Sequence, residues 1–178
     1  MDSYKMTICG LERELPLCPL NDKLDIAAFV MFGDVELTVA AGEALLKKCP
    51  EFDYIVTAEA KGIPLAYEMS RQSGKPYYVC RKGPKLYMRN VVMVDVRSIT
   101  TNKVQTICFD GEEGASMTGK RVLIVDDVIS TGESLTAIET VLSKFDVNIV
   151  GKVAVLAEGD AAKRDDIIYL EELPLFSK

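Results

Sequence analysis

Two stretches of this chain repeat the same order: a short apolar run, a segment with helical periodicity, and a second apolar run. The first unit begins with "DYIVTA" at residues 53–58 and returns with "YYVCR" at residues 77–81. The second begins with "VLIV" at residues 122–125 and returns with "NIVGKVAVLA" at residues 148–157. Strands that alternate with helices across short connections favour a parallel sheet covered by helices.

The helical segments carry apolar residues on one face. Residues 34–48, "DVELTVAAGEALLKK", end in two lysines, which suits the negative end of a helix dipole. A second helix is expected at about residues 62–72, where Pro64 fits the first turn. A third is expected at about residues 131–145. The pattern therefore predicts an α/β fold with a mostly parallel central sheet flanked by helices.

The chain is expected to form one domain over residues 1–178. Its core spans about residues 34–157. The segments at about residues 1–33 and 158–178 form a small hood, and the charged, then apolar tail packs over the sheet edge.

Composition excludes several classes of function. The formal net charge of −6 disfavours general binding to nucleic acid or to a membrane surface, although a local basic site can still bind an anion. The chain has no histidine, which excludes Ser-His-Asp and Cys-His nucleophiles. Its five scattered cysteines lack C-x-x-C spacing and fit a reducing cytosol. Neither a signal peptide nor a transmembrane run is recognisable, so a cytoplasmic protein is expected.

The stretch "RVLIVDDVISTGESL" at residues 121–135 carries the most informative chemistry. A buried strand ends on two acids, Asp126 and Asp127, although adjacent carboxylates resist burial. The polar turn "STGES" then leads into a helix N-terminus, where unpaired N–H groups favour an anion. Ser130-x-x-Glu133 also fits a capping box, which requires no ligand. Neither the Walker A nor the dinucleotide-binding glycine pattern is present.

"VLIVDDVISTGES" resembles the phosphoribosyl-pyrophosphate signature of type I phosphoribosyltransferases. The resemblance implies that Asp126 and Asp127 bind the ribose 2′ and 3′ hydroxyls. It also implies a catalytic role for Asp126. It further implies that the turn wraps the 5′-phosphate through Ser130, Thr131, Gly132, Glu133 and Ser134. Glu133 would contribute its backbone N–H, with its side chain turned away.

Two further stretches resemble the same family. "TAEAKG" resembles the pyrophosphate loop, which implies substrate-binding roles for Glu59, Ala60, Lys61 and Gly62, with Lys61 also catalytic. "RKGPKLY" resembles a stretch of the adenine-using members, with its Gly-Pro order altered. It would bring Arg81 and Lys85, as catalytic residues, and Lys82, as a substrate-binding residue, near the pyrophosphate. The alternatives are an ordinary strand-to-helix turn for the first stretch and a solvated basic turn for the second.

The resemblance implies transfer of ribose 5-phosphate from phosphoribosyl pyrophosphate to a purine, with pyrophosphate leaving. Mg²⁺ would be held mainly by substrate and water, with no protein ligand assigned. A segment at about residues 86–102 would form a mobile loop. Glu158 would face the base. The protein would be a homodimer. Adenine is the first choice of base, because "RKGPKL" resembles a stretch of the adenine-using members. Xanthine or another 6-oxopurine follows on "SITTNKVQTI".

Two other classes stay open on sequence alone. A regulator of the same fold could sense the sugar donor and bind DNA, but the roughly 52 residues before the first sheet strand carry several acids and no helix-turn-helix spacing. A non-catalytic module could bind the same ligand without turnover. The expected partners are therefore phosphoribosyl pyrophosphate and a purine base, with no nucleic acid and no membrane.

Overall fold

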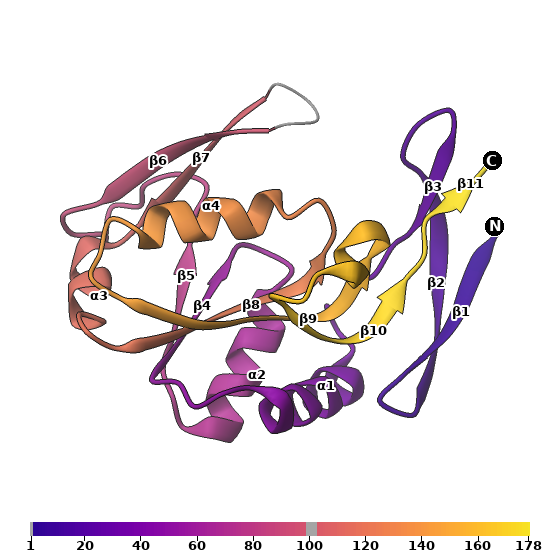
Figure 1. Cartoon of the computed structure of the whole chain (residues 1–178), viewed down its shortest axis with the longest axis horizontal. Helices are drawn as coiled ribbons and strands as arrows, with labels where there is room; N and C mark the ends of the chain where they lie inside the picture. The colour runs from indigo at the N-terminus through magenta and orange to yellow at the C-terminus, as the bar shows by residue number, and fades with distance from the viewer. Residues whose placement is uncertain (1, 99–102) are drawn as a thin grey trace.

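The computed structural model describes residues 2–98 and 103–178. Its centre is a five-stranded sheet in which every pair of neighbouring strands is parallel (Figure 1). This confirms the predicted α/β architecture. The strands, in their order across the sheet, are β10 (Ile168–Leu173), β9 (Asn148–Glu158), β8 (Arg121–Ile129), β4 (Tyr54–Ala58) and β5 (Tyr77–Cys80).

Helices cover both faces of this sheet. Helices α1 (Val35–Lys48) and α2 (Ile63–Ser73) lie on one face, and α4 (Glu133–Leu142) lies on the other (Figure 1). Asp34 caps α1 by accepting a hydrogen bond from the backbone N–H of Leu37, and a proline occupies the first turn of α2 as predicted. Each helix buries its apolar stripe on the sheet, so the strand ends are held rigidly.

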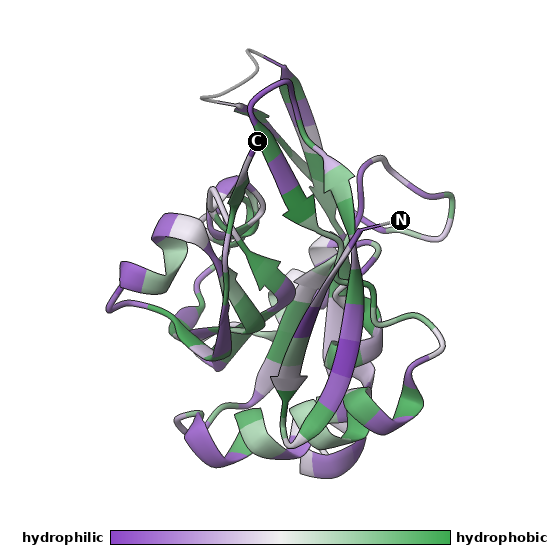
Figure 2. Ribbon diagram, turned by 90° about the vertical axis from the view of Figure 1, so that its right-hand side faces the viewer, coloured by the Kyte–Doolittle hydropathy of each residue, from purple (hydrophilic) through white to green (hydrophobic). Residues whose placement is uncertain are grey.

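The hood is a second, antiparallel sheet. It consists of β1 (Ser3–Ile8), β2 (Leu11–Pro19), β3 (Leu24–Ala27) and the short C-terminal β11 (Phe176–Ser177). Exposed residues alternate with partly or fully buried ones along β1 and most of β2, and Figure 2 shows polar and apolar bands along the strands. The two terminal segments thus join as expected, and the tail also supplies β10 at the edge of the central sheet. Pro16 and Pro19 lie within β2 and do not prevent this strand.

A two-stranded hairpin, β6 (Val92–Arg97) and β7 (Val104–Phe109), lies beside α4. Part of the predicted mobile loop, residues 99–102, lies outside the described residues. The stretch at residues 110–120 contains a short helix, α3 (Gly111–Ser116). Asp110 caps it by accepting hydrogen bonds from two backbone N–H groups. A 3₁₀ turn, η1 (Gly159–Lys163), joins β9 to β10.

The described part of the chain holds no helix that is both long enough and apolar enough to cross a membrane.

Candidate functional site

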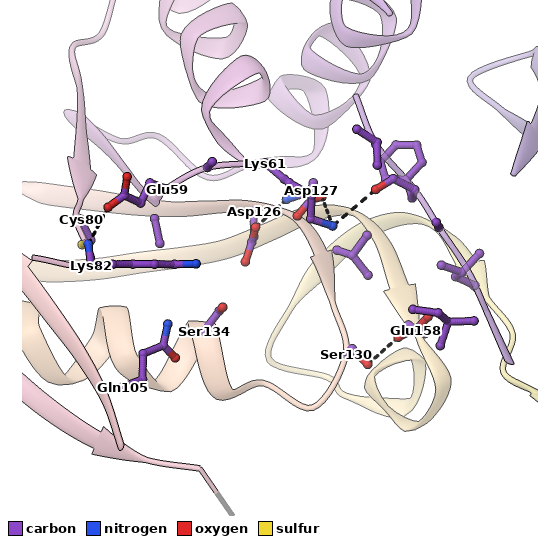
Figure 3. A pocket seen from close by; sticks show the side chains of 18 of the residues that line it. Glu59, Lys61, Cys80, Lys82, Gln105, Asp126, Asp127, Ser130, Ser134 and Glu158 are labelled. Atoms are coloured by element: carbon purple, nitrogen blue, oxygen red, sulfur yellow. Dashed lines mark hydrogen bonds and ion pairs between the residues drawn. The ribbon is translucent and has the colours of Figure 1, made fainter. Parts of the chain in front are cut away.

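A cavity of about 480 Å³ opens at the carboxyl ends of β4 and β8, beneath the hood. This is where parallel α/β sheets bind ligands. Polar and charged side chains from five separate segments point toward it (Figure 3). Of the residues proposed from sequence, those that line it are Glu59, Ala60, Lys61, Lys82, Asp126, Asp127, Ser130, Ser134 and Glu158.

The acid pair lies near the carboxyl end of β8. Because successive side chains of a strand point to opposite faces, one acid lies on each side of the strand. Asp127 is nearly enclosed, and its Oδ2 lies 3.2 Å from the Nζ of Lys61. Asp126 faces the cavity, and its Oδ1 accepts a 2.8 Å hydrogen bond from the backbone N–H of Asp127. Burial, reinforced by the neighbouring Asp127 carboxyl, holds the pKa of Asp126 well above its ordinary value. The site therefore concentrates acceptor oxygens where hydroxyl donors would stabilise them.

The loop between β4 and α2 brings Lys61 to the acids. Besides its ion pair with Asp127, the ammonium lies 3.5 Å from the carbonyl oxygen of Phe29, so it also contacts the hood. The peptide bond between Glu59 and Ala60 is cis. Gly62 lies behind the cavity, not on its lining: a Cβ at this position would be 2.5 Å from Thr57 Oγ1 and 3.2 Å from Asp126 Oδ1. A glycine is thus required for the loop to pack against the acid-bearing strand.

The predicted basic cluster divides between the cavity and its surroundings. Lys82 lines the cavity, whereas Arg81 and Lys85 do not. Arg81 Nε lies 3.2 Å from Glu59 Oε2, and its Nη1 donates a 2.5 Å hydrogen bond to Tyr87. The backbone N–H of Lys82 and the Arg81 guanidinium together lower the pKa of Glu59. Glu59 therefore fixes the basic segment in place, and the catalytic roles of Arg81 and Lys85 stay predictions.

The turn after β8 does not form the predicted capping box. Helix α4 begins at Glu133, with Gly132 as a left-handed N-cap and without a side-chain cap hydrogen bond. Ser130 Oγ instead donates a 2.6 Å hydrogen bond to Glu158 Oε2. Glu133 Oε1 accepts a 2.8 Å hydrogen bond from Ser98 Oγ, at the end of β6. The helix start thus lacks the capping box, although the backbone N–H of Glu133 donates a 3.4 Å hydrogen bond to Thr131 Oγ1.

A smaller hollow of about 200 Å³ lies at this turn. It collects all five proposed phosphate-binding residues, and Asp126 lines both this hollow and the main cavity. The two spaces are therefore neighbouring parts of one site. The residues that line the hollow are Gln105, Asp126, Val128, Ile129, Ser130, Thr131, Gly132, Glu133, Ser134 and Leu135.

Several lining residues were missed by sequence reasoning. Gln105 reaches the site from β7, and the hood supplies an apolar wall from residues 26–30 together with Leu173. The hood stretch "IAAFV" carries no polar group that would have marked it. Gln105 occupies an alternating position of a strand, where a polar residue usually signals only solvent exposure. Both depend on segments that meet only in three dimensions.

The donor set suits Mg²⁺ that arrives with a phosphorylated substrate. Within residues 2–98 and 103–178, no group of three or more His, Cys, Asp or Glu side chains is arranged to hold a metal ion. Mg²⁺ commonly keeps several waters and takes one or two carboxylates plus substrate phosphates. Asp126 and Asp127 supply carboxylates of that kind beside the cavity.

Comparison with known proteins points to one family. The model of the family described as "Phosphoribosyl transferase domain" matches residues 36–173. The purine biosynthesis transcriptional repressor PurR of Bacillus subtilis is 31% identical over 110 residues, which cover 62% of this chain and 38% of that protein. A hypoxanthine/guanine phosphoribosyltransferase of Methanococcus voltae is 38% identical over 112 residues, covering 63% of this chain and 56% of that protein. The chain thus spans less than two thirds of the length of these relatives.

Solved structures share the fold at low sequence identity. The adenine phosphoribosyltransferase of Thermoanaerobacter pseudethanolicus has a TM-score of 0.74 at 18% identity, covering 89% of this chain and 95% of that one. The adenine phosphoribosyltransferase of Rhodothermus marinus has a TM-score of 0.72 at 21% identity, covering 89% and 94%. These likenesses establish a common architecture.

Proposed function

Because this chain belongs to the phosphoribosyl transferase domain family, we propose that it transfers ribose 5-phosphate from phosphoribosyl pyrophosphate to a purine base. The observation that carries the proposal is that an acid pair, a polar turn at a helix N-terminus and a loop bearing Lys61 lie around one cavity. Each part matches one group of the donor: sugar hydroxyls, 5′-phosphate and pyrophosphate.

The donor is proposed to lie along the end of β8. The carboxylates of Asp126 and Asp127 accept hydrogen bonds from the ribose 2′ and 3′ hydroxyls. The backbone N–H groups and hydroxyls of residues 130–134 surround the 5′-phosphate at the start of α4. Lys61 and Lys82 both line the cavity and bring positive charge toward the pyrophosphate. Ligand binding would draw the Lys61 ammonium from Asp127 toward the more highly charged pyrophosphate.

Catalysis is proposed to be mainly electrostatic. As the bond between the sugar carbon and pyrophosphate breaks, the sugar gains oxocarbenium character and negative charge collects on the leaving group. The nearby Asp126 carboxylate stabilises the sugar cation, and the Lys61 ammonium stabilises the pyrophosphate. Bound Mg²⁺ would add further charge neutralisation on the phosphate oxygens. The apolar wall of the hood excludes water and so protects the donor from hydrolysis.

The base is proposed to lie between the hood and Glu158. One carboxylate oxygen of Glu158 is held by Ser130, which leaves the other able to accept a hydrogen bond from a purine N–H. Adenine is the base we propose first, on the basic stretch that follows β5. Hypoxanthine or guanine is the second candidate, because phosphoribosyltransferases similar to this chain in sequence carry that name.

A homodimer in the cytoplasm is proposed as the working form. Val35 and Tyr67 are exposed apolar side chains that line one shallow groove beside α1 and α2, a surface suited to a second copy of the chain. All five cysteines are free thiols, as a reducing compartment would maintain them. Light scattering of the native chain and of Val35→Glu tests the dimer. A wild-type mass equal to one chain would contradict it.

Pyrophosphate release tests the function. The protein is incubated with phosphoribosyl pyrophosphate, Mg²⁺ and, separately, adenine, hypoxanthine, guanine and xanthine. Turnover with at least one base is expected. The double variant Asp126→Asn/Asp127→Asn should lose donor affinity at least about a hundredfold, since two charged acceptors are removed. The control Glu171→Gln/Glu172→Gln removes two adjacent exposed acids on β10 and should leave affinity unchanged. No turnover with any base would refute the proposal.

A further inference from the structure

A cation outside the proposed site lies against the phosphate turn. Arg164 follows η1, about thirty residues along the chain from the turn. A Cβ built on Gly132 would come within 2.8 Å of Arg164 Nη1, closer than atoms pack. The guanidinium therefore occupies the space beside the backbone of Gly132. It lines neither the main cavity nor the hollow at the turn, so it contacts the turn from behind.

The orientation of this guanidinium is fixed from its opposite edge. Arg164 Nε and Nη2 donate 2.8 Å hydrogen bonds to the two carboxylate oxygens of Asp166. Asp166 Oδ2 also lies 3.3 Å from Lys152 Nζ, which in turn lies 2.8 Å from Glu139 Oε1 on α4. These four side chains form a row of alternating charges. The fork geometry uses two nitrogens on Asp166 and leaves Nη1 directed at the turn.

The turn itself provides little positive charge. Among the described residues that line its hollow are the acids Asp126 and Glu133, and none of these residues is Lys or Arg. A sugar phosphate would bring up to two more negative charges. Backbone N–H groups and the helix dipole favour an anion there, but the Glu133 carboxylate opposes it. A fixed cation behind the turn would offset that opposition.

We propose that Arg164 is a positioning residue for the 5′-phosphate: held by Asp166, it supports the backbone of the turn at Gly132 and supplies the positive charge that the turn lacks. The proposal rests on the proposed function, because it assigns a role at the same phosphate site. The role of Arg164 is distinct from that of Lys61, which is proposed to bind the pyrophosphate end of the donor. Loss of Arg164 should therefore affect one phosphate group of the donor and spare the other.

Binding of separate fragments tests this distinction. Ribose 5-phosphate and Mg²⁺-pyrophosphate are each titrated into the full chain by calorimetry. Arg164→Gln should weaken ribose 5-phosphate binding by about tenfold, the effect of one charge a few ångströms from a partly screened phosphate. Pyrophosphate affinity should stay within about twofold. Lys163→Gln is the matched control: it removes the same charge one residue away, where Lys163 is exposed and pairs only with Asp160 within the described residues.

Two further measurements separate charge from general disturbance of the fold. Arg164→Lys keeps the charge but not the fork, so it should restore part of the lost affinity. Phosphorus NMR of bound ribose 5-phosphate should show a phosphate pKa that rises in Arg164→Gln, because a nearby cation favours the dianion. Equal losses for both fragments, or unchanged ribose 5-phosphate binding and phosphate pKa, would overturn the inference. If the wild-type chain binds neither fragment, the proposed function fails with it.

Discussion

Ser130 Oγ donates a 2.6 Å hydrogen bond to Glu158 Oε2, which joins the phosphate turn to the end of β9. Both residues line the main cavity, from segments that are neighbours in the parallel sheet. The hydrogen bond fixes one oxygen of Glu158 and turns the Ser130 hydroxyl toward the proposed base pocket. Ser130 therefore connects the part of the site that would hold phosphate with the part that would hold the base.

Replacing Ser130 with alanine should affect the base more than the donor. The variant Ser130→Ala leaves the Glu158 carboxylate without its donor, and a hydrogen bond to a charged group contributes about 1.5–3 kcal/mol. The KM for the purine should rise by about tenfold or more, with a smaller change for phosphoribosyl pyrophosphate. Steady-state kinetics with each substrate varied in turn measures both. The control Ser134→Ala, which lines the same cavity, should change only the donor KM, and the reverse pattern would contradict the connection.

The fold and much of the site followed from sequence because their signals are local. A strand of four apolar residues followed by two acids and a glycine turn identifies the end of β8 without any partner. Glu133 shows where local reasoning fails. Its spacing from Ser130 fitted a capping box, but Ser130 has a partner on β9 and Glu133 has one in Ser98, the residue directly after β6. The hood wall was missed for the same reason, since apolar residues reveal burial but not what they enclose.

The ionised Asp126 carboxylate should lower the folding stability of the protein while it serves the proposed activity. Its pKa is raised in the folded protein, mainly by burial and then by Asp127, so ionising it at neutral pH costs folding free energy. The variant Asp126→Asn should therefore melt at a higher temperature near pH 7. In a domain of this size, each kcal/mol added to the free energy of unfolding raises the melting temperature by about 2–4 °C. Activity should fall sharply in the same protein.

The pH dependence gives this prediction its sign. A carboxyl with a raised folded pKa binds its proton more tightly when folded, so its penalty grows as pH rises above the unfolded value, about 3.9, toward the folded pKa. Below the unfolded value Asp126 is protonated in both states, and the advantage of the variant should vanish. Melting curves from pH 3.5 to 8 test this. A constant difference across that range would show that titration of Asp126 is not the cause.

Gly62 should tolerate no side chain, because its missing Cβ leaves room for Thr57. The variant Gly62→Ala places a methyl group 2.5 Å from Thr57 Oγ1 and should destabilise the fold by about 1–3 kcal/mol. Adding Thr57→Ala removes the clashing oxygen and should recover part of the loss. Gly83→Ala, where nothing lies within 4 Å, is the control. Urea unfolding measures wild type, Gly62→Ala, Thr57→Ala, the double variant and Gly83→Ala, and strictly additive effects of the first two substitutions would argue against a direct clash.

Glu133 should weaken binding of the donor through its charge. Its carboxylate accepts a hydrogen bond from Ser98 at the start of α4, the helix proposed to bind the 5′-phosphate, where a second anion is unfavourable. Glu133→Gln keeps an acceptor oxygen for Ser98 while removing the charge, so the KM for phosphoribosyl pyrophosphate should fall by about two- to fivefold at low salt. Because Glu133 is only partly buried, salt should still screen its charge, and the gain should shrink at about 0.5 M salt. Glu112→Gln, which removes an exposed acid on α3, should change neither value. A higher KM in Glu133→Gln would mean that the carboxylate supports the turn more than it repels the phosphate.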